Sequence, residues 1–146
     1  MSSERREEGK EVITLDEAMQ QLNLLEEQIK KLQNIVADLE TRITRMSSIE
    51  SILVELKEGS DNVLIPLDQA FSVVVKGSIK PIERAIVHVG LNIFVEVDRE
   101  KAIEIIRKER MSASKLLEMY SRELSKVTQY YSALRSAVEQ ALTAQR

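Results

Sequence analysis

The chain has 146 residues, of which 31% are charged and only 3% are aromatic, and its formal net charge is −3. One domain of this composition suits a solvated helical assembly better than a compact enzyme. Basic residues are interspersed with acidic ones, so the basic surface that nucleic acid binding requires is not expected.

The chain contains no cysteine, which excludes disulfides and thiolate metal ligands. No apolar run approaches the roughly 20 residues of a membrane span. Residues 1–11 are charged where a signal peptide would have an apolar core. We therefore expect a soluble cytoplasmic protein with no membrane partner and a flexible N-terminus over residues 1–11.

A first helix is predicted by an apolar repeat of seven residues over residues 15–56. Such a repeat forms one narrow apolar stripe on a charged helix, and the stripe needs a partner helix to cover it. Thr14 and Glu17 have the spacing of a capping box, and Gly59 suits the residue that ends a helix. We expect a coiled-coil helix over residues 12–58. Its stripe consists of Leu15, Ala18, Leu22, Leu25, Ile29, Leu32, Val36, Leu39, Ile43, Met46 and Leu53.

The middle segment, residues 62–97, is rich in β-branched side chains and is divided by Pro66, Gly77, Pro81 and Gly90. This pattern is typical of short strands separated by turns. We expect two β-hairpins, joined by a connection over residues 77–82. The predicted strands cover residues 63–66, 71–76, 84–89 and 93–97, with hairpin turns at 67–70 and 90–92.

Both faces of the predicted strands carry apolar side chains: Val73 and Val74 are consecutive, and Phe94 lies on the face opposite to Ile93 and Val95. A segment this short does not cover two apolar faces by itself. We therefore predict an oligomer that assembles through residues 63–97. The expected interface consists of Val63, Leu64, Ile65, Phe71, Val73, Val75, Val87, Val89, Ile93, Phe94 and Val95.

A second helix is predicted over residues 98–144, with Asp98 as its N-cap. It carries a matching stripe that would pair with the first helix in antiparallel orientation. Only Glu50 and Arg110 interrupt the two repeats. Because both repeats have the same period, the agreement of successive layers does not establish the register. The second stripe consists of Ile103, Ile106, Ala113, Leu117, Tyr120, Leu124, Val127, Tyr131, Leu134, Val138 and Ala141.

Residues for catalysis or for a cofactor are scarce. His88 is the single histidine, and on a predicted strand it is more often structural than a base or a metal ligand. The four glycines lie too far apart for a loop that binds phosphate. The carboxylates lie along helices beside lysine and arginine, where solvated ion pairs are the ordinary interpretation. We expect no enzyme activity, no cofactor and no metal.

The open ends of the two helices, which we call the arm tips, are the predicted site for binding client proteins. An equally good interpretation applies to four of these residues: they would complete the seam, the apolar contact between the two helical stripes. They are Leu15, Leu22, Leu134 and Val138. Val12, Ile13 and Leu142 lie off the seam near chain ends that fray, so part of their apolar area would meet water. The candidate client-binding residues are Val12, Ile13, Leu15, Met19, Leu22, Tyr131, Leu134, Val138 and Leu142.

The middle segment resembles the α-type subunits of prefoldin in residues 62–67, Phe71, residues 87–90 and residues 94–96. The two predicted hairpins resemble those of the α-type subunit, because the β-type subunit has only one hairpin. The sequence departs from the family at residues 68–70, where a glycine-rich turn is usual, and this departure concerns only the geometry of the turn.

The resemblance covers nearly the whole chain and implies an α+β fold: a long antiparallel coiled coil with two β-hairpins at one end that assemble into an oligomeric β-barrel. The whole chain would then be one prefoldin-like domain. The resemblance implies an assembly of two α-type and four β-type subunits. It also implies a chaperone that uses no ATP, captures unfolded clients between its arm tips and delivers them to a group II chaperonin.

A different class of function stays open: a structural coiled-coil adaptor that docks one folded partner. Broad binding of unrelated unfolded proteins would favour the chaperone, whereas one tight, saturable partner would favour the adaptor.

Overall fold

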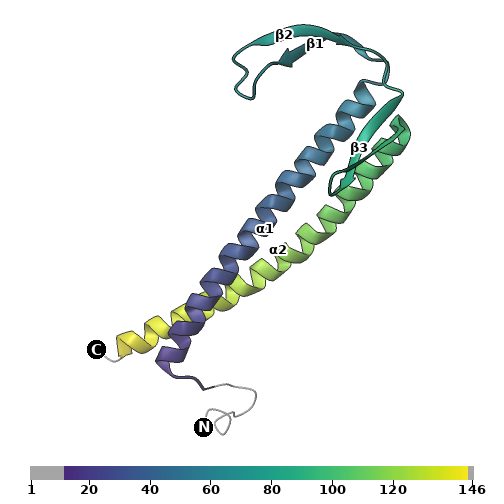
Figure 1. The fold of residues 1–146 in the computed structure, drawn as a ribbon. Helices are drawn as coiled ribbons and strands as arrows, with labels where there is room; N and C mark the ends of the chain where they lie inside the picture. The colour runs from purple at the N-terminus through teal and green to yellow at the C-terminus, as the bar shows by residue number, and fades with distance from the viewer. Residues whose placement is uncertain (1–11, 145–146) are drawn as a thin grey trace. The chain divides into compact units, whose positions relative to one another are not determined.

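The computed structural model describes residues 12–144, so the predicted flexibility of residues 1–11 lies outside the described residues. Along the chain, one long helix precedes four strands and a second long helix follows them (Figure 1). In chain order they are α1 (Leu15–Glu55), β1 (Ser60–Pro66), β2 (Val74–Ile79), β3 (Arg84–Gly90), β4 (Ile93–Asp98) and α2 (Arg99–Ala144). The prediction of two long helices and two hairpins is confirmed.

The chain forms two compact units, and each contains part of both helices. The arm unit comprises residues 12–39 and 116–144, and the hairpin unit comprises residues 40–115. Within residues 12–144, neither helix contains an apolar stretch that would cross a membrane.

The predicted caps are present at the helix ends. The Glu17 amide donates to Thr14 Oγ1 at 3.1 Å, and the Thr14 amide donates to Glu17 Oε2 at 3.3 Å, which completes the capping box. After α1, Gly59 adopts the predicted left-handed conformation with a φ of 76°. Before α2, Asp98 Oδ1 accepts from the Lys101 amide at 2.8 Å. Local side-chain chemistry therefore sets these boundaries.

The predicted stripes form the core within each unit. Most of their residues are buried or partly buried, whereas the intervening residues are mostly exposed. Ala141 is an exception: it occupies a predicted seam position but is exposed. The buried stripe residues are Ala18, Leu32, Leu39, Val127 and Val138 in the arm unit, and Ile103, Ile106 and Ala113 in the hairpin unit.

Arg99 ties the first turn of α2 to the end of α1 within the hairpin unit. Its residue is only 9% exposed. Its Nη1 donates to the backbone oxygen of Leu53 at 3.1 Å, and the guanidinium also pairs with Glu100. Because the last carbonyls of a helix lack partners within it, this contact caps α1 as well as joining the helices.

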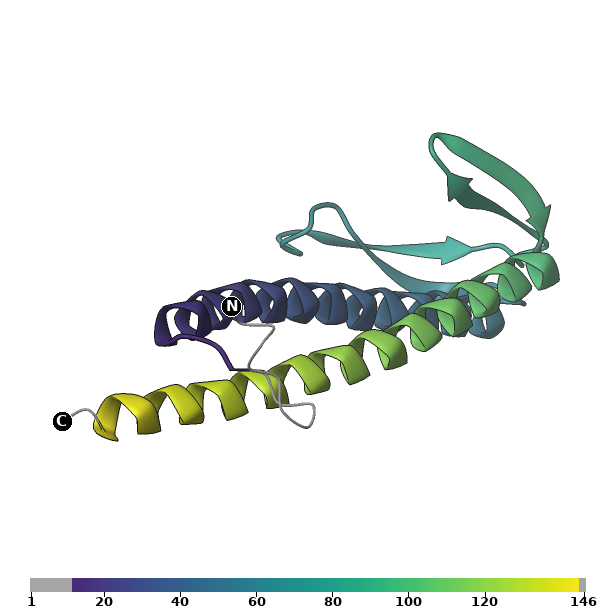
Figure 2. The same ribbon diagram turned by 90° about the horizontal axis from the view of Figure 1, so that it is seen from below.

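The four strands form two separate antiparallel pairs, β1 with β2 and β3 with β4. Figure 2 shows the two hairpins as distinct ribbons. The β1–β2 pair runs from Ser60 opposite Ile79 to Pro66 opposite Val74, with an irregularity between Ser60 and Val63. The β3–β4 pair runs from Arg84 opposite Asp98 to Gly90 opposite Ile93.

The first hairpin differs from the prediction at both ends of β2. This strand begins at Val74 rather than at Phe71, because the backbone of Phe71 is left-handed with a φ of 57°. The turn therefore extends to residue 73. The strand then continues through Gly77 to Ile79, into the segment predicted as a connection, where these residues pair with Val63 and Ser60.

Candidate binding surfaces

The arm tips lie in the arm unit and expose three apolar side chains most: Val12 (47%), Met19 (48%) and Leu142 (43%). Ile13 and four stripe residues, Leu15, Leu22, Tyr131 and Leu134, are partly buried. Val138 is buried, so the structure places it in the seam rather than on a free surface. The predicted site therefore divides into an exposed group and a group that closes the core.

Tyr131 is held in place by a polar contact across the two helices of the arm unit. Its hydroxyl donates to Glu26 Oε1 at 2.6 Å. This bond to a carboxylate raises the pKa of Tyr131 above its ordinary value, because ionisation would break the bond and place two negative charges together. The phenol is thus oriented toward Glu26 and not toward a client at the tip.

The β1–β2 hairpin exposes most of the residues predicted for assembly. Leu64 is 67% exposed and Phe71 is 66% exposed, and Ile65, Val73 and Val75 are also exposed, whereas Val63 is partly buried. Leu67 and Val74 extend this apolar surface and were not predicted as members of it. Leu67 directly follows β1, and Val74 is the first residue of β2, whose start differs from the prediction.

Asp68 organises the turn that carries Phe71. Its Oδ1 accepts from the Ser72 amide at 2.7 Å, and the Phe71 amide donates to the Asp68 backbone oxygen at 3.3 Å. The bond from Ser72 lowers the pKa of Asp68, because it stabilises the ionised carboxylate. A side-chain hydrogen bond thereby holds a turn in which an aromatic residue, Phe71, has a positive φ.

The β3–β4 hairpin exposes Val89, Ile93, Phe94 and Val95, four of the residues proposed for assembly. Val87 is different, because it is buried within this chain and is not available to a partner. Sequence reasoning missed Ile86 and Leu91, which are 71% and 88% exposed. The pleat gives the signal for Ile86, since neighbours in a strand face opposite sides and Val87 faces inward.

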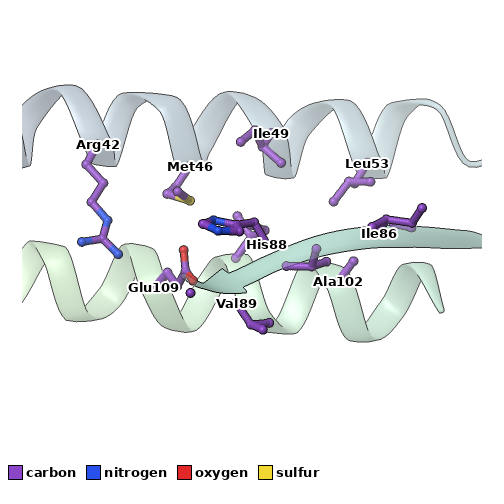
Figure 3. Close-up of a pocket in the computed structure, with 13 residues that line it drawn as sticks. Arg42, Met46, Ile49, Leu53, Ile86, His88, Val89, Ala102 and Glu109 are labelled. Atoms are coloured by element: carbon purple, nitrogen blue, oxygen red, sulfur yellow. The ribbon is translucent and has the colours of Figure 1, made fainter. Parts of the chain in front are cut away.

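A cleft of about 520 Å³ lies in the hairpin unit between β3 and the two helices. In Figure 3, Met46, Ile49 and Leu53 of α1 line one side of the cleft, while Ala102 and Glu109 come from α2. The lining is mainly apolar, and β3 contributes Ile86, Val87 and Val89 to it.

His88 lines this cleft, but its ring contacts other residues of the β3–β4 hairpin. Its Nε2 lies 2.6 Å from the backbone oxygen of Leu91, and its ring packs against Phe94 with 4.8 Å between centroids. Among residues 12–144 no three histidine, cysteine or carboxylate side chains are grouped to hold a metal ion. The observed contacts of His88 therefore describe a structural residue that stabilises the β3–β4 turn.

The fold and its exposed surfaces define a coiled-coil protein with two apolar β-hairpins between its helices. The family model for prefoldin subunits matches residues 25–144. The chain is 54% identical over 132 residues to prefoldin subunit alpha of Hyperthermus butylicus, covering 90% of this chain and 86% of that protein. The corresponding protein of Aeropyrum pernix is 32% identical over 130 residues, covering 88% and 85%.

Among solved structures, filamentous PFD from Methanocaldococcus jannaschii matches with a TM-score of 0.61 and 19% identity, covering 84% of this chain and 98% of that one. At this identity the likeness shows a shared fold. Together with the family model and the relatives, it leads to one conclusion. The chain belongs to the prefoldin family, whose members are chaperone subunits.

Proposed function

We propose that this chain is the α-type subunit of a cytoplasmic chaperone that binds non-native proteins without using ATP. The whole chain would act as one domain: the hairpins assemble the complex, and the arm tips hold the client. The client would then pass to a group II chaperonin. This proposal rests on the family and on where the chain leaves apolar side chains exposed.

The observation that carries the proposal is the apolar surface of both hairpins. Leu64, Phe71, Ile86 and Phe94 are each more than 60% exposed, although strands with such side chains are normally covered. Pairing with hairpins of other subunits would remove this area from water. By resemblance, these partners are four β-type subunits and a second α-type subunit, whose strands together form a β-barrel platform.

The arm tips are suited to weak contacts with varied clients. A contact of a few hundred Å² contributes several kcal/mol at about 25 cal/mol per Å², before the cost of association is subtracted. One arm would therefore bind weakly. Several arms around one client would strengthen the hold, because each further contact forms at a high effective concentration. Met19 supports this role, since its unbranched side chain adapts to different surfaces.

The proposed site is tested by exchanging the exposed tip residues. In the complete assembly, Val12, Met19 and Leu142 are changed to serine, and suppression of the aggregation of a denatured client is measured. A matched control changes Met111, Leu116 and Met119 to serine, because these α2 residues have similar exposure but lie away from the tips. We expect reduced suppression for the tip variant and unchanged suppression for the control.

Two results would count against the proposal. Equal suppression by both variants, in complexes that remain assembled, would remove the tips from the mechanism. Saturable binding of a single folded protein, with no activity toward unfolded ones, would favour the coiled-coil adaptor instead.

A further inference from the structure

The two charged residues that interrupt the apolar stripes meet in the hairpin unit. Glu50 Oε2 lies 2.6 Å from Arg110 Nη1, and Glu50 Oε1 accepts from Arg107 Nε at 2.6 Å. The Glu50 side chain is only 14% exposed, and that of Arg110 is 33% exposed. One carboxylate of α1 therefore binds two guanidinium groups of α2 at a level of the seam where apolar packing is interrupted.

The apolar layers alone leave the register of the two helices ambiguous. Because both stripes repeat every seven residues, sliding one helix by a heptad, about 10 Å, brings apolar residues opposite apolar residues again. Glu50 responds differently to such a slide. It would move away from Arg107 and leave a mostly buried carboxylate without that partner, which is unfavourable.

We infer that Glu50, Arg107 and Arg110 form a register lock, which selects one alignment of α1 and α2 from those that the apolar stripes allow. Polar groups at single seam positions have this effect in coiled coils, because a wrong register separates them. The exposed pairs of Glu104 with Lys101 and Lys108 lack this capacity, since all three residues lie on α2.

The cross-helix bond of the arm unit is consistent with the same alignment. Glu26 bonds Tyr131, and Glu50 bonds Arg107. Positions 26 to 50 on α1 and positions 107 to 131 on α2 both span 24 residues. The Glu50–Arg107 bond and the Glu26–Tyr131 bond therefore correspond to the same alignment of the α1 sequence with the α2 sequence.

The register can be measured with two spin labels, because the chain has no native cysteine. Ser51→Cys and Ser112→Cys place the labels at exposed positions of α1 and α2. Labelled full-length chain, diluted with unlabelled chain, reports the intramolecular distance by pulsed electron resonance. We expect one distance for the parent chain. The variant Glu50→Leu with Arg110→Leu should add a second distance that corresponds to a slide of about 10 Å.

Three further variants make the result decisive. Glu104→Leu is the matched control and should keep one distance. Glu50→Arg with Arg107→Glu and Arg110→Glu, which reverses the charges of all three residues, should also keep one distance. Glu50→Gln keeps the side-chain size and should broaden the distribution even if the leucine variant fails to fold. An unchanged single distance in both Glu50→Gln and a folded leucine variant would overturn the inference. A second distance in the Glu104→Leu control would do the same.

Discussion

At the scale of single residues, Asp68 gives a pH-dependent test of the β1–β2 turn. Its carboxylate accepts from the Ser72 amide, and this bond lowers its pKa. Because the folded pKa lies below the unfolded one, the stabilisation is complete above the ordinary aspartate pKa and is lost as pH falls through the folded value. We expect Ser72 amide exchange, corrected for the intrinsic effect of pH, to accelerate over that acidic range.

Asp68→Ala should abolish this pH dependence and accelerate Ser72 exchange already at neutral pH. Asp61→Ala is the matched control, since Asp61 is exposed in the same hairpin at β1. If Ser72 exchanges equally fast in the parent chain and in Asp68→Ala, the carboxylate does not hold the turn.

Tyr131 has the opposite pH dependence. Its bond to Glu26 raises the phenol pKa, so the stabilisation is present below the ordinary tyrosine pKa and is lost as pH rises through the higher folded value. Ultraviolet titration of tyrosinate should therefore show a late phase. We expect Tyr131→Phe to remove this phase, and the control Tyr130→Phe to retain it. A late phase that survives in Tyr131→Phe would assign it to another tyrosine.

At the scale of elements, Gly59 joins the end of α1 to the start of the hairpins. A Cβ at this position would lie 2.2 Å from the backbone oxygen of Ile79, and its φ of 76° disfavours other residues. We expect Gly59→Ala to lower the free energy of unfolding by roughly 1–3 kcal/mol or more, because backbone strain and a backbone clash combine.

The matched control for Gly59→Ala is Gly77→Ala. There the added Cβ would meet only the Ile65 side-chain terminus, at 2.7 Å, and that side chain can rotate away. Chemical denaturation of both variants, followed by circular dichroism, measures the difference. Equal losses would show that the backbone contact at Gly59 does not control the stability of this junction.

The helices were predictable from the sequence because their signals are local and repeated. Thr14 with Glu17 and Asp98 supply caps whose chemistry involves neighbouring residues only, and the heptads specify the buried face along each helix. The boundaries of β2 were not predictable in the same way. The left-handed conformation of Phe71 depends on the hydrogen bond from the Ser72 amide to the Asp68 side chain. Strand propensities of single residues do not include such a bond.

The candidate surfaces were predictable to a similar extent. Alternation and composition identified most of the exposed hairpin residues, such as Leu64 and Phe94. Burial of Val87 was missed because it depends on how β3 lies against the helices, which is a long-range contact. The meeting of Glu50 with Arg110 was missed for the same reason. Both residues were recognised as interruptions, but their pairing depends on the register.

At the scale of the whole molecule, assembly and client binding are proposed to use different surfaces, and this separation can be tested. Changing Leu64 and Ile86 to glutamate places charges on the two hairpins at residues that are 67% and 71% exposed. Side chains this exposed contribute little to the fold of the single chain. In an assembly they would be buried, where an unpaired charge is strongly unfavourable.

We expect this double variant to remain folded but to dissociate, as measured by native mass spectrometry with the β-type partner. Its suppression of client aggregation should fall by a factor of about a hundred or more, because single arms lose the gain from multivalent binding. Met119→Glu is the matched control: Met119 is 53% exposed on α2, outside the hairpins and the arm tips, and its variant should assemble and act normally. A dissociated double variant with full chaperone activity would refute the dependence on assembly, whereas an intact complex would refute the proposed hairpin interface.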